Sequence, residues 1–156
     1  MEEGIKKKES IDFVETIKEQ FQLKPEEAAL YSPLVLAYLG DCVYEIILRT
    51  VIVCRGNMSV NDLNKKVSYF AKATTQSKLV KQLINEFTEE EKKIFKRGRN
   101  AKSVTIAKHA SMTEYRMATG WEALVGYLYL KEQYNRLIAL TKLGIQYLEN
   151  KEFSLG

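Results

Sequence analysis

Apolar side chains recur every three or four residues along most of the chain, which is the spacing of an amphipathic α-helix. The first such stretch places four apolar side chains on one face: Ile11, Val14, Ile17 and Phe21. Only two prolines and eight glycines interrupt the 156 residues. The pattern therefore predicts an all-α fold.

Prolines and capping residues predict where the next helices begin. Pro25 suits the first turn of a short second helix, and Pro33 suits the first turn of a third helix that ends near Val53. Ser59, with Asp62 three residues later, predicts the cap of a fourth helix. We expect a break in the pattern at 74–75, after which apolar spacing resumes.

Capping residues and apolar spacing also predict the helices in the second half of the chain. Thr88 and Glu91 resemble a capping box, which opens a short helix that ends before Gly98. Residues 97–110 are predicted to be irregular, and two longer helices follow over 111–130 and 134–150. We see no internal repeat, linker or low-complexity tract, so the prediction is one domain over residues 1–156.

Composition indicates a globular protein, with 46% hydrophobic and 28% charged residues. The net charge of +4 permits nucleic-acid binding without diagnosing it. Cys42 and Cys54 provide neither a disulfide framework nor a zinc site. The N-terminus lacks an apolar signal core, and Glu45 and Arg49 interrupt the longest apolar stretch. We expect a cytoplasmic protein with reduced thiols and no membrane span.

Two acidic residues stand inside otherwise apolar helical stretches. Asp41 lies in "LAYLGDCVYEI" and Glu122 lies in "ATGWEALVGYLYL". A buried carboxylate is costly unless it is paired, hydrogen-bonded or bound to a metal. Small residues stand near each acid and allow close helix contact. They are Gly40 beside Asp41, and Ala118, Thr119, Gly120, Ala123 and Gly126 around Glu122. If the two helices cross there, the two carboxylates meet.

Two like charges in a dry cleft repel each other unless a cation lies between them. Oxygen ligands select Mg²⁺ or Mn²⁺, and a carboxylate-held Mg²⁺ suits phosphoryl chemistry. The alternative is that Asp41 and Glu122 are unrelated structural acids, each satisfied by a hydroxyl or an arginine. Glu45 lies one turn after Asp41 and could join a cation through water, although an ion pair with Arg49 is favoured.

A basic segment covers residues 92–108, with seven Lys or Arg and no acid. A flexible basic loop can follow a phosphate backbone, so the segment is a candidate RNA-binding surface. Its candidate contacts are Arg97, Arg99, Asn100, Lys102 and Lys108. The alternative is a solvated surface loop. The lone His109 could act as a general base, but a loop contact or simple solvation is favoured.

These stretches resemble a known family. "LAYLGDCVYE" resembles the ribonuclease III signature, and "GWEALVGYLYL" resembles the second acidic helix of that family. "KRGRNAKS" and "YRMATGWEALVGYLYL" are similar to its Mini-ribonuclease III branch. The resemblance covers about residues 34–148. It implies an all-α ribonuclease III-type catalytic domain, a homodimer, and Mg²⁺-dependent cleavage of double-stranded RNA, with Mn²⁺ as a possible substitute. It also implies a role in maturing large-subunit (23S) ribosomal RNA precursors.

The resemblance carries over to individual positions. It implies that Asp41 and Glu122 are the catalytic, metal-holding acids. Other acids of the larger ribonuclease III enzymes are replaced here by Leu34, Ala37 and Thr119. These departures count against a full four-carboxylate, two-metal cage. The chain ends soon after its last predicted helix, so a separate double-stranded RNA-binding domain is not expected, and RNA binding falls to the basic segment.

Two rival functions remain at this point. A non-catalytic helical RNA-binding or ribosome-assembly module would need the basic segment but not the two acids. A metal-dependent nucleotide phosphohydrolase would act on free nucleotides.

Overall fold

The predicted helical fold is present in the computed structural model, which describes residues 12–102 and 111–150. Those residues contain no strand. They form the α-helices α1 (Phe13–Gln20), α2 (Pro33–Arg55), α3 (Val60–Ala71), α4 (Ala73–Leu83), α5 (Glu89–Asn100), α6 (Met112–Leu130) and α7 (Tyr134–Glu149). Two short 3₁₀ helices, η1 (Ala28–Leu30) and η2 (Ile84–Glu86), lie between them.

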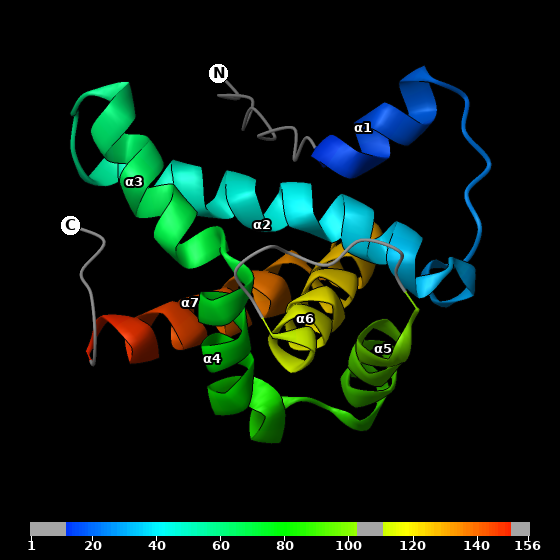
Figure 1. Ribbon diagram of the computed structural model, residues 1–156. Coiled ribbons are helices and arrows are strands. Elements are labelled where there is room, and N and C mark those ends of the chain that lie inside the picture. The colour runs from blue at the N-terminus through cyan, green and yellow to red at the C-terminus, as the bar shows by residue number, and fades with distance from the viewer. Residues whose placement is uncertain (1–11, 103–110, 151–156) are drawn as a thin grey trace, which may run out of the picture.

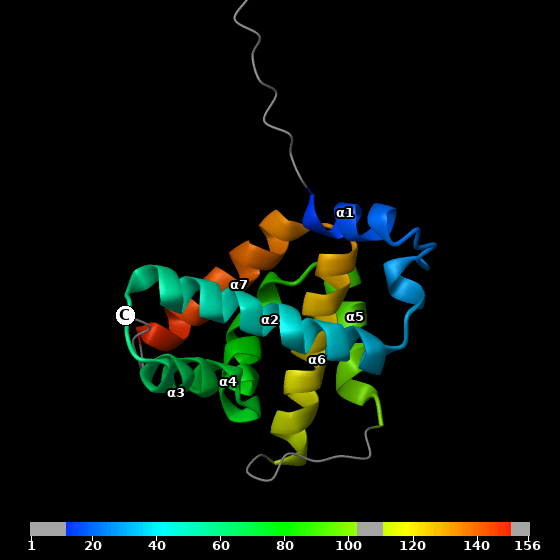
Figure 2. The same ribbon diagram turned by 90° about the horizontal axis from the view of Figure 1, so that it is seen from above.

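Helix α6 runs through the middle of the molecule. Helix α2 crosses over it, α5 lies on one flank, and α4 and α7 lie on the other (Figures 1 and 2). Most of α6 from Ala118 to Leu128 is buried on every side. A helix that is apolar all round is typical of a buried core helix. Helix α6 is therefore the element against which the others are placed.

Side-chain caps fix where several helices begin. The Ser32 hydroxyl accepts a hydrogen bond from the Val35 N–H at the start of α2. The predicted Ser59 cap of α3 is confirmed. Thr88 and Glu91 form a complete capping box at the start of α5, as predicted. Each cap satisfies N–H groups that have no partner within the helix.

Glycines bring α2 and α6 into backbone contact. A Cβ atom at Gly40 would fall 1.7 Å from the main-chain carbonyl oxygen of Glu122. A Cβ atom at Gly126 would fall 2.1 Å from the carbonyl oxygen of Leu36. No larger residue fits at either position without moving a helix, so these glycines set the depth of the crossing.

Helix α5 runs through Gly98 to Asn100, so the prediction that it ends before Gly98 is wrong. A Cβ atom at Gly98 would fall 2.7 Å from the Cβ of Ala123 and 2.9 Å from the Cα of Gly120. Gly98 thus serves close packing against α6, and this contact outweighs the low helix propensity of glycine. The predicted irregularity is likewise wrong for residues 97–100.

Other differences concern helix ends. Pro25 does not open a helix, because residues 23–27 are irregular and only η1 follows. The predicted break at 74–75 lies at Lys72, whose extended backbone separates α3 from α4. Lys108 and His109 lie outside the described residues. Within the described part of the chain, no helix is long and apolar enough to cross a membrane.

Candidate active site

The crossing of α2 over α6 carries the two acids. Asp41 directly follows Gly40, and Gly40 lies against the backbone of Glu122 itself. The side chains of Asp41 and Glu122 therefore emerge from two helices at one contact. Burial raises the pKa of Glu122 to about 7, and the nearby charge of Asp41 is the second cause. The predicted helix crossing is thus present, and it brings the two carboxyl groups near enough for the charge of Asp41 to act on Glu122.

The sequence predicts that Asp41 lies in a buried or an interface helix, and in the single chain Asp41 is exposed, so its own chain does not bury it. Its neighbours in the sequence are apolar, but several of them, such as Tyr38 and Ile46, are exposed as well. Partial loss of water around Asp41 raises the pKa of its carboxyl group, and the charge of Glu45 adds to this effect. The pair therefore combines one accessible acid with one half-buried acid.

Glu45 forms an ion pair with Arg49, with 2.8 Å between Oε1 and Nη2. This confirms the pairing favoured by the four-residue spacing. Both side chains are exposed or partly exposed, so the pair adds little stability. Glu45 still affects the site through its charge beside Asp41.

Two further side chains, Tyr44 and Gln76, lie near Glu122, and Gln76 is hydrogen-bonded to it. The Tyr44 hydroxyl donates to the main-chain carbonyl of Phe70 at 3.0 Å, and the Tyr44 ring lies edge-on to Trp121. Gln76 on α4 donates from Nε2 to Oε1 of Glu122 at 3.1 Å. Burial raises the pKa of Tyr44, and the charge of Glu122 is the second cause. The Glu122 carboxylate is thus held among three helices.

Gln76 was not identified from the sequence as part of the site. Gln76 lies in the polar run 74–77, which reads as a solvent-facing turn of helix. In the structure Thr75, Gln76 and Ser77 are all buried. A single sequence contains no signal that distinguishes this run from an exposed one.

Of the predicted RNA-binding residues, Arg97, Arg99 and Asn100 lie in the last turn of α5 rather than in a loop, Lys102 lies in the irregular stretch just after it, and Lys108 is outside the described residues. The Arg97 guanidinium donates to the carbonyl oxygens of Ala29 at 2.8 Å and Tyr31 at 3.2 Å. These bonds tie α5 to the segment before α2. Arg99 donates from Nε to the Asn100 side chain and is partly exposed, and Lys102 is exposed. Arg97 is also exposed, but its guanidinium is already hydrogen-bonded to two carbonyl groups, so Arg99 and Lys102 are the cations of this group with no main-chain carbonyl partner among the described residues.

The donor set at the crossing suits a hydrated divalent cation. Two carboxylates are the ligands that Mg²⁺ prefers, and this ion keeps several waters in proteins. No group of three or more His, Cys, Asp or Glu side chains comes together among the described residues. Within that part of the chain, a cation at this position would have Asp41 and Glu122 as its acidic ligands.

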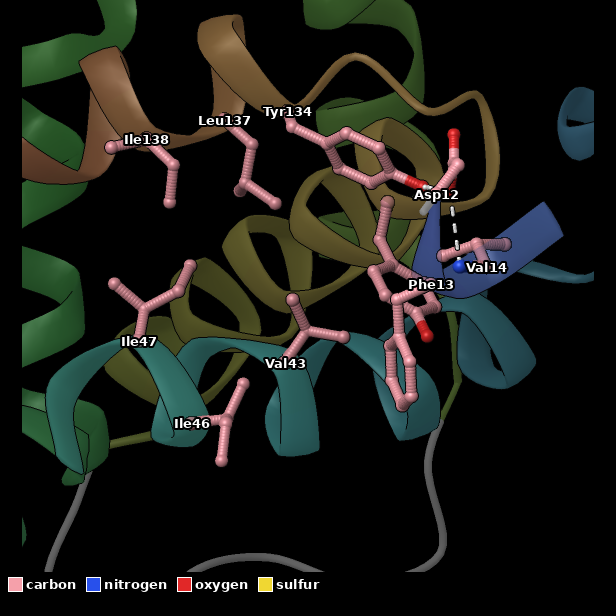
Figure 3. Close-up of a pocket in the computed structure, with 10 residues that line it drawn as sticks. Asp12, Phe13, Val14, Val43, Ile46, Ile47, Tyr134, Leu137 and Ile138 are labelled. Atoms are coloured by element: carbon pink, nitrogen blue, oxygen red, sulfur yellow. Dashed lines mark hydrogen bonds between the residues drawn. The ribbon is translucent and has the colours of Figure 1, made fainter. Parts of the chain in front are cut away.

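A pocket of about 540 Å³ lies elsewhere, between α1, α2 and α7 (Figure 3). Its walls are mainly aliphatic, and its polar edge is the bond from the Tyr134 hydroxyl to Asp12 at 2.8 Å. Successive residues of a helix turn by roughly 100°. Val43, Ile46 and Ile47 therefore face the pocket from the side of α2 away from Asp41, and the pocket is not the candidate active site.

The raised pKa of Glu122 predicts a pH-dependent effect of its removal. The folded-state pKa of about 7 exceeds the reference value of 4.5. The neutral acid therefore favours folding below pH 4.5, and this contribution is lost as the pH rises through 7. In metal-free buffer we expect Glu122→Gln to stabilise the protein on the order of 2 kcal/mol at pH 8 and hardly at all at pH 4.5. Urea denaturation at the two pH values measures this, and an equal effect at both would contradict it.

Known proteins identify the family. Residues 34–133 match the ribonuclease III domain. The Mini-ribonuclease 3 of Clostridium tetani is 48% identical over 126 residues, which are 80% of this chain and 83% of that protein. The Mini-ribonuclease 3 of a Thermoanaerobacter species is 45% identical over 132 residues, which are 84% of this chain and 93% of that protein. A crystal structure from Fusobacterium nucleatum aligns with a TM-score of 0.71 at 32% identity, covering 78% of this chain and 98% of the other. The chain therefore belongs to the Mini-ribonuclease 3 group of the ribonuclease III family and is an endoribonuclease.

Proposed function

We propose that this endoribonuclease cleaves double-stranded RNA with Mg²⁺ held by Asp41 and Glu122. The observation that carries the proposal is the convergence of these two acids at the crossing of α2 and α6, in a chain of this family. Mn²⁺ has the same preference for oxygen ligands and would substitute.

The chain's own residues would act as follows. Asp41, the exposed acid, is open to the RNA backbone. Glu122 is held in place by Gln76 and by its packing in α6. A bound Mg²⁺ would polarise a phosphate oxygen and lower the pKa of an attacking water. Attack on the phosphodiester would leave 5′-phosphate and 3′-hydroxyl ends, as the family resemblance implies.

The direct test is cleavage of a labelled RNA duplex by the full chain, with Mg²⁺ or with excess EDTA. We expect fragments only with Mg²⁺, and a ligation assay would identify their 5′-phosphate ends. Free nucleotides in a parallel reaction test the phosphohydrolase alternative. Binding of the duplex without cleavage in any metal would instead favour the non-catalytic RNA-binding or ribosome-assembly module.

We infer that the end of α5 binds the RNA backbone. Charge at a phosphate contact acts through counterion release, which is independent of base sequence. Arg99 and Lys102 supply accessible charge, and Asn100 supplies an exposed amide. Lys108 stays a prediction for the same role. Arg97 also has a structural role, because its guanidinium donates hydrogen bonds to the carbonyl groups of Ala29 and Tyr31.

Replacing Arg99 and Lys102 together by alanine should raise the KM for a duplex more than it lowers kcat. Lost backbone contacts weaken ground and transition states alike. The log–log salt dependence of binding should flatten by about one unit per lost contact. Lys142→Ala, at an exposed position on α7, is the control that removes one positive charge away from α5. An unchanged salt slope in the double variant would mean that RNA is held elsewhere.

We propose that the active form is a homodimer joined along α2. Apolar side chains remain exposed at helical spacing on the outer stripe of α2: Val35, Tyr38, Ile46 and Val53. Tyr38 is 84% exposed, which is unusual for a large ring on a helix beside a catalytic acid. A two-fold axis at this stripe would pair it with itself and bring two sites to one duplex, one for each strand.

Light scattering should show a dimer at micromolar concentration. Ile46→Arg, in the middle of the exposed stripe, should give a monomer, because it places two charges at a self-complementary contact. Leu143→Arg, at a comparably exposed apolar position on α7, is the control and should stay dimeric. A fully active wild-type monomer would contradict the proposal.

The substrate we propose in the cell is the precursor of large-subunit (23S) ribosomal RNA, as the family resemblance implies. Accumulation of an extended precursor when the gene is deleted would test this role. A cytoplasmic location stays a prediction.

A further inference from the structure

Gln76 is a buried amide beside the acid pair. It stands in the first turn of α4 and is 1% exposed. A glutamine amide has two N–H donors and one carbonyl acceptor, and buried polar atoms normally find partners. The partners of this amide therefore indicate what the side chain does.

Both donors of Gln76 are used. Nε2 donates to the Ala71 carbonyl oxygen at 2.6 Å and to Oε1 of Glu122 at 3.1 Å. Ala71 is the last residue of α3, where main-chain carbonyls lack partners within the helix. A carbonyl oxygen can only accept, so the Ala71 contact determines which end of the amide faces it. Nε2 is thereby fixed toward Glu122.

The acceptor of Gln76 is not used. Its Oε1 atom is buried and has no hydrogen-bond partner among the described residues. Leaving a buried carbonyl unpaired costs about 1–3 kcal/mol. If Gln76 served only to pair the Ala71 carbonyl group, the cost of its own unpaired oxygen would have no compensating benefit.

The unpaired oxygen lies close to the carboxylate. The oxygen and nitrogen of one amide are about 2.2 Å apart. Adding the 3.1 Å bond, Gln76 Oε1 is within about 5.3 Å of Oε1 of Glu122. One water at about 2.8 Å from each of two oxygens joins them, at its near-tetrahedral angle, when they are about 4.6 Å apart. This separation lies within the upper limit of about 5.3 Å, so the geometry allows one water beside the Glu122 carboxyl group to be shared with Gln76.

We propose that Gln76 is a positioning residue for the cation site: it holds Glu122 by Oε1, leaves Oε2 for the cation, and accepts a hydrogen bond from a cation-bound water. The inference rests on the proposed Mg²⁺ site and adds a partner behind its acidic ligands. Such outer partners typically change metal affinity 10- to 100-fold.

The test is Mn²⁺ binding to the full chain without RNA, measured by calorimetry. Gln76→Met keeps the length of the side chain and removes both polar ends. We expect Mn²⁺ to bind about tenfold more weakly, and half-maximal duplex cleavage to need about tenfold more Mg²⁺. Because saturating metal restores the occupied site, kcat should recover at high Mg²⁺.

The matched control is Ser77→Ala. Ser77 is the next residue, is equally buried, and also has an unpaired oxygen. Its removal should leave Mn²⁺ affinity unchanged. If Gln76→Met does not fold, Gln76→Asn is measured instead. Asparagine is one methylene shorter and cannot reach both Ala71 and Glu122, so its Mn²⁺ affinity should also fall.

Mn²⁺ binding by the variants distinguishes the role of Gln76 from the existence of the cation site itself. A folded Gln76 variant with wild-type Mn²⁺ affinity and a lower melting temperature would overturn the positioning role and leave Gln76 as an anchor for α3. If Asp41→Asn and Glu122→Gln also bind Mn²⁺ like the wild type, the cation site itself is wrong. Weaker binding in all three variants supports both proposals.

Discussion

Asp41→Asn is expected to slow duplex cleavage by about 100- to 1,000-fold while the fold survives. Asparagine keeps the shape of the side chain and removes the charge that would hold a cation. The loss corresponds to about 3–4 kcal/mol of transition-state stabilisation. Asp41 is exposed, and partial loss of water together with the charge of Glu45 raises the pKa of its carboxyl group. A neutral side chain is therefore not expected to destabilise the fold.

The measurement is the single-turnover rate with a labelled duplex at saturating Mg²⁺, together with the melting temperature of each variant. Glu122→Gln should behave alike. The double variant should be hardly slower than either single one, because residues that hold one cation act as a unit. Glu45→Gln is the matched control: it removes a neighbouring charge that already pairs with Arg49, and a modest change is expected. Near-normal cleavage by Asp41→Asn would overturn the site.

The sequence predicted the helices that have strong local signals. Ser59, Thr88 and the apolar spacing located the starts of α3 and α5, and the long apolar runs located α2 and α6. The crossing was predicted from small residues beside each acid, and Gly40 and Gly126 do form it, whereas Gly120 packs against Phe95 of α5 instead. The family resemblance is confirmed by relatives that cover most of the chain.

The errors have physical causes. Gly98 was interpreted as a helix end, since local propensity cannot show that its missing side chain admits α6. The sequence did not decide whether Asp41 lies in a buried or an interface helix, because an apolar stripe has the same sequence whether its own chain or another surface covers it. Gln76 was missed because a buried polar run resembles an exposed one until tertiary contacts are known.

Gly40→Ala tests whether the crossing itself holds the two acids in place. The added methyl group would lie 1.7 Å from the Glu122 carbonyl oxygen and 2.7 Å from the Gly126 nitrogen. Both are backbone atoms, so no rotamer change relieves the overlap and α2 must move away from α6. We expect a loss of about 3 kcal/mol or more in the free energy of unfolding, despite the gain of about 1 kcal/mol from replacing a helical glycine by alanine.

The control is Gly56→Ala at the end of α2. There the nearest neighbour of an added Cβ is the Met58 side chain at 3.9 Å, and the backbone is extended, so alanine fits. Urea denaturation of both variants distinguishes the effect of disturbing the helix crossing from the general effect of replacing a glycine by alanine. The folded fraction of Gly40→Ala should also bind Mn²⁺ poorly, because a shifted α2 moves Asp41 away from Glu122. Equal stability of the two variants would mean that α2 and α6 tolerate separation, and that their close contact does not position the acid pair.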